Sequence, residues 1–103
     1  MAAFTLAVNP TFTAKVGIPV AGGATVEVDF TFKHRTRADM EKWLSGGADR
    51  ENVQAILDMC EGWELVDKFD KKSVTQLCEN YIGAPRAIVD VYIAELTAAK
   101  AKN

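Results

Sequence analysis

The sequence has little that points to chemistry. Its 103 residues include two cysteines, three prolines and one histidine. It contains no G-x-x-x-x-G-K-[ST] loop for phosphate, no G-x-G-x-x-G for a dinucleotide and no G-x-S-x-G for serine hydrolysis. Carboxylates are present, but no nucleophile or oxyanion-binding group accompanies them. We therefore expect no enzymatic activity, no catalytic residue and no cofactor.

The few metal-ligating residues are widely spaced. His34, Cys60 and Cys78 are separated by 26 and 18 residues, which matches no paired spacing such as C-x₂-C or H-x₃-H. We expect no metal site, and we interpret both cysteines as buried free thiols on apolar helix faces. A disulfide between them would depend on geometry that the spacing does not define.

Long apolar runs and a strong net charge are also missing. No segment approaches the ~20 apolar residues of a membrane span. The first ten residues have no basic region and are interrupted by Asn9-Pro10, so we expect no secretory signal. The net charge of -2 gives no overall attraction to nucleic acid or acidic membranes.

Two local charge patterns remain. Lys33–Arg37 is a dense basic stretch, but three permanent cations without an aromatic stacking motif favour a solvated or partner-facing edge over nucleic-acid binding. Carboxylates also recur every third residue, which indicates either a solvated face with helix caps or an acidic surface for a basic partner. The members of this series are Asp58, Glu61, Glu64, Asp67 and Asp70.

Two segments with alternating apolar residues predict strands. Thr11–Val20 turns its even-numbered residues to one face, and Pro19 favours an edge position. Val26–His34 alternates in the same way, with Val26, Val28, Phe30 and Phe32 on one face. The Gly22-Gly23 loop between them predicts an antiparallel hairpin. Two strands alone are marginal in water, so the apolar face must lie on helices or on another subunit.

From residue 36 onward the apolar spacing becomes helical. We expect a first helix over Arg37–Ser45, capped by Thr36. A second helix is expected from Ala48 or Asp49 to about Glu61, with Gly62 near its end. The residues expected to point inward are Met40, Trp43 and Leu44 in the first helix, and Val53, Ile56, Leu57 and Cys60 in the second.

An apolar connector, Trp63 to Phe69, leads to two further helices. Asp70 or Ser73 is expected to cap the third. Gly83 is expected to end it in a left-handed conformation, and Pro85 to begin the fourth. The apolar residues of the fourth helix cover roughly 200° of its circumference, whereas a surface helix needs only ~100°. Either this helix is the centre of the core, or its second side is reserved for another chain.

These elements predict one α+β domain over residues 1–103. An antiparallel β-hairpin would occupy residues 1–35, and a bundle of about four α-helices would occupy residues 36–98. Residues 99–103 have no apolar anchor, so we expect a frayed tail.

Several stretches together resemble the tail assembly chaperones of lambda-like long-tailed bacteriophages. They are the hairpin, Phe32–Thr36 leading into the first helix, Gly62–Asp67 with its tryptophan, and Tyr81–Ile88 followed by Tyr92. The match extends from about Phe12 to Leu96. The matching residues Trp63, Tyr81, Gly83, Ile88 and Tyr92 resemble scaffold positions, and the family has no catalytic residues to transfer.

The resemblance implies a protein of the host cytoplasm that is absent from the mature virion. It would bind the phage tape measure protein, help recruit the tail tube protein and self-associate. Ribosomal frameshifting, which in many phages gives a longer form, would fit the lysine- and alanine-rich end. Alternatives are a structural tail completion or joining subunit, or a small nucleic-acid-binding regulator. The candidate partner-binding residues are Trp63, Tyr81, Ile88, Tyr92 and Ile93.

Overall fold

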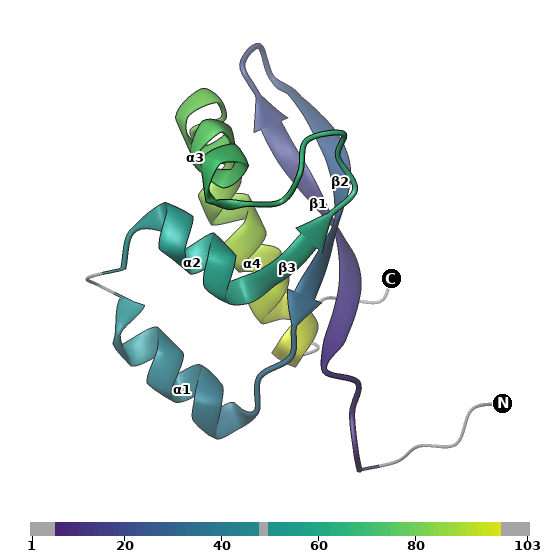
Figure 1. Cartoon of the computed structure of the whole chain (residues 1–103), viewed down its shortest axis with the longest axis vertical. Coiled ribbons are helices and arrows are strands. Elements are labelled where there is room, and N and C mark those ends of the chain that lie inside the picture. Colours follow the sequence, from purple (N-terminus) through teal and green to yellow (C-terminus); the bar gives the residue numbers. More distant parts are fainter. Residues whose placement is uncertain (1–5, 48–49, 98–103) are drawn as a thin grey trace, which may run out of the picture.

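The chain folds into a sheet with helices on one side of it (Figure 1). The computed structural model describes residues 6–47 and 50–97, and over these residues it contains three strands and four helices. The order is an N-terminal antiparallel hairpin, two helices, a short third strand and two more helices. The predicted α+β class, a hairpin followed by four helices, is therefore confirmed.

The sheet has the strand order β1-β2-β3, and both pairs are antiparallel. Strand β1 (Thr11–Val20) pairs with β2 (Ala24–Lys33) along its whole length, from Thr11 opposite Lys33 to Val20 opposite Ala24. The turn between them needs positive φ at both glycines, and Gly22 and Gly23 have φ of 105° and 99°. The edge position expected for the strand that contains Pro19 is confirmed.

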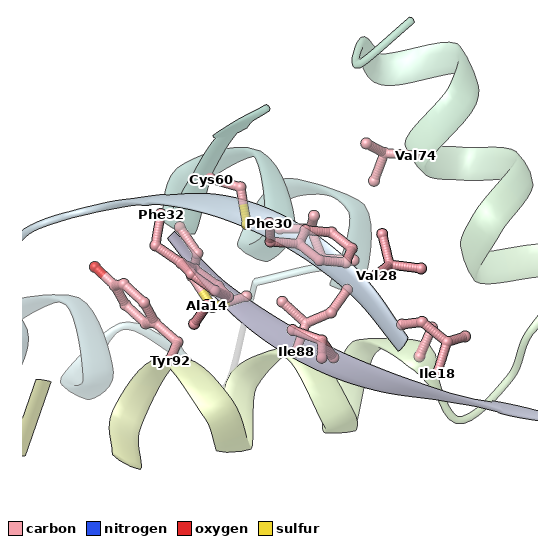
Figure 2. Packing of buried hydrophobic residues seen from close by; sticks show 13 residues of the cluster. Ala14, Ile18, Val28, Phe30, Phe32, Cys60, Val74, Ile88 and Tyr92 are labelled. Atoms are coloured by element: carbon pink, nitrogen blue, oxygen red, sulfur yellow. The ribbon is translucent and has the colours of Figure 1, made fainter. Parts of the chain in front are cut away.

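The core lies between the sheet and the helices. Alternation turns Ala14, Val16 and Ile18 of β1 to the same face as Val28, Phe30 and Phe32 of β2, and all six are buried. Figure 2 shows Ile88 and Tyr92 pointing from the last helix toward these strands. The other buried apolar residues are Ile56, Met59, Cys60, Val74 and Ala84, and Pro85 is also buried.

The four helices are α1 (Arg37–Ser45), α2 (Asn52–Met59), α3 (Lys71–Asn80) and α4 (Ala84–Thr97). Two predicted caps are confirmed. The Thr36 hydroxyl accepts a hydrogen bond from the Asp39 amide at 3.1 Å, and the Asp70 carboxylate accepts one from the Ser73 amide at 2.8 Å. Helix α4 packs over β1, whereas α2 packs over β2 and β3.

The prediction for the second helix was wrong at its end. The helix stops at Met59, and Cys60–Trp63 form the short strand β3. This strand pairs with the side of β2 that is opposite to β1. Pairing there satisfies backbone groups of β2 that β1 does not reach, which favours a strand over another turn of helix. The start predicted at Ala48 or Asp49 lies outside the described residues, and α2 begins at Asn52.

Three smaller expectations also need correction. Leu44 does not point inward: it is 49% exposed, because none of the described elements covers that side of α1. Gly83 has no positive φ; its lack of a side chain instead allows close packing, because a Cβ there would lie 3.1 Å from Cγ of Pro19. Pro85 is the second residue of α4 rather than the first.

Helix α4 is the central helix of the core. Ala84, Ile88 and Tyr92 are fully buried on the side toward the sheet, and Val89 and Leu96 pack against the core as half-buried residues. This distribution agrees with the first of the two interpretations of its wide apolar arc. The predicted end of the helical region at residue 98 and the tail at 99–103 lie outside the described residues.

Candidate functional site

An open groove lies between the turn end of the hairpin and α3. Its volume is about 330 Å³. The floor is apolar and consists of the core-facing side chains near the end of the hairpin, among them Val26, Val28 and Phe30. Trp63 and Leu65 line one side, and Tyr81 lies where α3 ends. The hairpin extends beyond the helices here, so its apolar face continues past the closed core.

Helix α3 contributes the polar side of the groove. Val74 anchors this helix in the core, and α3 packs against α2 and α4. Ser73, Gln76, Leu77 and Asn80 line the groove, and their spacing of three, four and seven residues places them on one helical face. The side chains of Gln76 and Asn80 thus offer amide donors and acceptors beside an apolar floor.

Three large apolar side chains remain exposed at this groove. Val26 is 54% exposed, Leu65 is 40% exposed and Tyr81 is 38% exposed. An isolated exposed apolar residue is ordinary, but several that border one groove indicate a contact surface. Other exposed large apolar residues do not line the groove: Leu6, Val8, Leu44, Val66 and Ile82.

Trp63 fixes the connector that borders the groove. Its ring packs edge-on against Phe30, with centroids 5.9 Å apart, and against Phe69, with centroids 5.0 Å apart. Its indole N–H donates a hydrogen bond to the Asp67 carbonyl at 2.7 Å. This bond folds the connector back over four residues, and it places Leu65 and Asp67 on the groove.

The structure separates the five candidate partner-binding residues. Trp63 and Tyr81 line the groove together. Ile88 and Tyr92 are fully buried in the core, so their side chains have no surface for a partner in this conformation. Ile93 is half-buried on α4 and does not line the groove.

Tyr92 has a clear structural role. Its ring stacks on Phe32 at 5.3 Å and on Phe12 at 6.2 Å between centroids. Its hydroxyl donates to the Lys33 carbonyl at 2.7 Å and accepts from the Arg35 guanidinium at 2.9 Å. Burial raises the pKa of this phenol, while the bond from Arg35 opposes the shift.

None of the nine residues of helix α1 is fully buried, and the helix packs against the core through the partly buried side chains of Met40 and Trp43. The Trp43 ring lies beside two guanidiniums, that of Arg50 at 4.5 Å and that of Arg35 at 5.0 Å from the ring centroid. The Trp43 indole N–H donates to the Asp58 carboxylate at 3.2 Å, and Arg50 forms an ion pair with the same carboxylate at 3.3 Å.

Contacts within the fold also involve the basic stretch Lys33–Arg37. Arg35 lies in the middle of the stretch, but its guanidinium donates to the Asp58 carbonyl at 3.0 Å and to the Tyr92 hydroxyl. Its guanidinium is therefore held within the fold by these hydrogen bonds, which weakens the case for a phosphate-binding patch. Asp58, the first member of the acidic series, is likewise occupied by Trp43, Gln54 and Arg50.

The two cysteines are free thiols, as expected, but Cys60 lies in strand β3 rather than on a helix face, and Cys78 of α3 is only half-buried. Burial raises the pKa of Cys60 to about 12 and also raises the pKa of Cys78. Within residues 6–47 and 50–97, no group of three or more His, Cys, Asp or Glu side chains is placed to hold a metal ion. None of the helices in these ranges has the length and hydropathy needed to cross a membrane.

Sequence reasoning missed Val26, Leu65 and the polar face of α3 as parts of one surface. A signal was present in the connector, where Leu65-Val66 is an apolar pair flanked by the charged residues Glu64 and Asp67. The alternation of the second strand also assigned Val26 to the core face, although the helices end before they cover it.

Comparison with known proteins gives the family. No curated protein and no solved structure matches the chain. The family model described as phage tail assembly chaperone matches residues 1–103, which is the whole chain. A match over this length shows that the chain belongs to the phage tail assembly chaperone family.

Proposed function

We propose that this chaperone binds the phage tape measure protein through the groove between the hairpin and α3. The observation that carries the proposal is the exposure of Val26, Leu65 and Tyr81 around one apolar groove of about 330 Å³. A long helical tape measure exposes apolar surface until the tail tube encloses it. A groove with an apolar floor and a polar side fits the apolar face of an amphipathic helix.

Among the candidate residues, Trp63 and Tyr81 would contact the tape measure protein directly. Both border the groove, and aromatic side chains provide large contact areas at protein interfaces. Ile88 and Tyr92 would act through the fold, because they are fully buried. The half-buried Ile93 lies on α4, away from the groove, and would contribute to a second contact.

The same hypothesis covers the later steps of assembly. A chaperone bound to the tape measure protein in the host cytoplasm would help recruit the tail tube protein and would be absent from the mature virion. This role is non-catalytic, since it operates by protein–protein contact alone. Membership in the family of tail assembly chaperones supports it.

Self-association is part of this proposal, because a long client needs many bound copies. Strand β1 is an edge of the sheet, and edge strands offer unpaired backbone groups to other chains. Helix α4 lies over the same strand and provides an alternative contact. Light scattering over a range of concentrations tests the point: we expect mass to rise with concentration, and a strict monomer would contradict it.

Substitutions in the groove test client binding. Leu65→Asp and Val26→Asp place a charge on the apolar surface, and each should reduce co-purification of the co-expressed tape measure protein by at least about tenfold. Val66→Asp is the matched control, because Val66 is fully exposed next to Leu65 and does not line the groove. Equal co-purification by Leu65→Asp and Val66→Asp, with both proteins folded, would exclude the groove.

A further inference from the structure

The described residues that line the groove carry negative charge but no positive charge. Its lining includes one carboxylate, that of Asp67, and among the described residues that line it there is no Lys or Arg. The remaining polar lining comes from Ser73, Gln76 and Asn80, which are uncharged. A ligand that fills this groove therefore meets apolar surface, neutral hydrogen-bonding groups and a single negative charge.

Asp67 is held at this position by its backbone. The hydrogen bond from the Trp63 indole to the Asp67 carbonyl is 2.7 Å long, and Trp63 is itself packed against Phe30 and Phe69. The carboxylate is therefore kept at the groove, although the residue is exposed.

The Asp67 carboxylate is also unpaired. Over residues 6–47 and 50–97, it takes part in no ion pair or side-chain hydrogen bond. Two other members of the acidic series have structural partners, since Asp58 binds Arg50 and Trp43 and Asp70 caps α3. Asp67 is the carboxylate of the series that lines the groove and is left without such a role.

We propose that Asp67 selects the ligand of the groove: an amphipathic helix that carries a lysine or arginine beside its apolar stripe. The apolar side chains would occupy the floor near Val26 and Val28, and the cation would pair with the Asp67 carboxylate at the border. The amides of Gln76 and Asn80 would bond polar side chains on the opposite flank. This inference rests on the proposed function, because it assumes that the groove is the client site.

The groove chemistry also disfavours other ligands. An anionic flank would meet the uncompensated Asp67 carboxylate, and like charges at close range disfavour binding. A segment without apolar residues would leave the floor near Val26 and Phe30 uncovered. The preferred partner thus combines an apolar stripe with positive charge on one flank.

A charge-reversal experiment tests this inference. The probes are two labelled synthetic helical peptides with leucines at positions i, i+3, i+4 and i+7. They differ at one flanking residue, which is lysine in one peptide and glutamate in the other. Fluorescence anisotropy with the full chain should give the lysine peptide about fivefold lower Kd. Asp67→Lys should invert this preference.

The control is Glu64→Lys, the same charge change on the same connector at a residue that does not line the groove. It should leave the preference for the lysine peptide unchanged. Equal affinity of the wild-type chain for both peptides, an unchanged preference in Asp67→Lys, or no binding of either peptide would overturn the inference. None of these outcomes would change the result of the Leu65→Asp co-purification test, which measures client binding at the groove. The two proposals can therefore fail separately.

Discussion

At the scale of single residues, Tyr92 ties α4 to the sheet and to the segment after β2. Tyr92→Phe keeps the ring stacking on Phe32 but removes the hydroxyl that bonds Lys33 and Arg35. We expect the free energy of unfolding to fall by about 1–2 kcal/mol, because a carbonyl and a guanidinium lose a partner. Urea denaturation measures this change.

The control for this substitution is Tyr81→Phe. The Tyr81 side chain is partly exposed at the groove, and its hydroxyl has no bond to another described residue. The change in stability should stay within about 0.5 kcal/mol. Equal stability of Tyr92→Phe and the wild type would show that the buried hydroxyl contributes nothing.

The two thiols provide a second residue-scale prediction. Cys60 is 1% exposed, and burial raises its pKa to about 12, so at pH 8 its thiolate is scarce and shielded. Cys78 is only half-buried, although its pKa is also raised. Alkylation of the native protein at pH 8, followed by mass spectrometry, should modify Cys78 first. Labelling of Cys60 at an equal rate without denaturant would contradict the buried position.

The burial of single residues shows what a spacing pattern can predict. Alternation and helical spacing correctly assigned Val16, Phe30 and Ile56 to the core. They failed for Leu44 and Val26, because periodicity tells which side of an element is apolar and not whether another element covers that side. Whether such a residue is core or contact surface depends on tertiary structure.

At the scale of elements, the short strand β3 marks the limit of sequence reasoning. The apolar spacing from Val53 to Cys60 continues the helical pattern, so a helix to Glu61 was the natural prediction. The strand has four residues and forms because β2 has a second free edge. Its stability comes from a partner some thirty residues away in the chain, and local propensity does not contain that information.

Helix α1 depends on the contacts of the Trp43 side chain. Trp43→Ala removes the ring beside Arg35 and Arg50 and the hydrogen bond to Asp58. None of the α1 residues is fully buried, and Met40 is the other residue of this helix that packs against the core besides Trp43. Amide hydrogen exchange in Arg37–Ser45 should therefore become at least about tenfold faster, with little change in β1 and β2.

Leu44→Ala serves as the control on the same helix. Leu44 is largely exposed, so its truncation should leave exchange in α1 nearly unchanged. A uniform acceleration across α1 and the sheet in Trp43→Ala would mean that the helix does not open separately from the rest of the protein. Slow exchange retained in α1 would mean that the contacts of the Trp43 ring with the two arginines and Asp58 are not needed to hold the helix.

At the scale of the whole molecule, the groove arises because the hairpin is longer than the layer of helices that covers the sheet. The hairpin extends beyond the helices that cover the sheet, and α3 faces the uncovered part across the groove (Figure 1). The family resemblance anticipated a protein that acts by contact, and two of its matching residues, Trp63 and Tyr81, border the groove. The groove itself depends on how α3 stands relative to β2, which no local pattern in the sequence encodes.

The net charge of -2 and the apolar floor define the thermodynamics expected for client binding. Burial of apolar surface should give a negative heat-capacity change in titration calorimetry with a tape measure fragment.

Only one exposed ion pair is expected at Asp67, so affinity should fall less than about fivefold between 50 and 200 mM salt. A nucleic-acid ligand held by six or more phosphate contacts would lose about 10³-fold or more over this range. A salt dependence that steep for the bound partner would shift the functional surface from the groove to the basic stretch Lys33–Arg37. A shallow salt dependence, together with loss of binding in Leu65→Asp, would assign the functional surface to the groove.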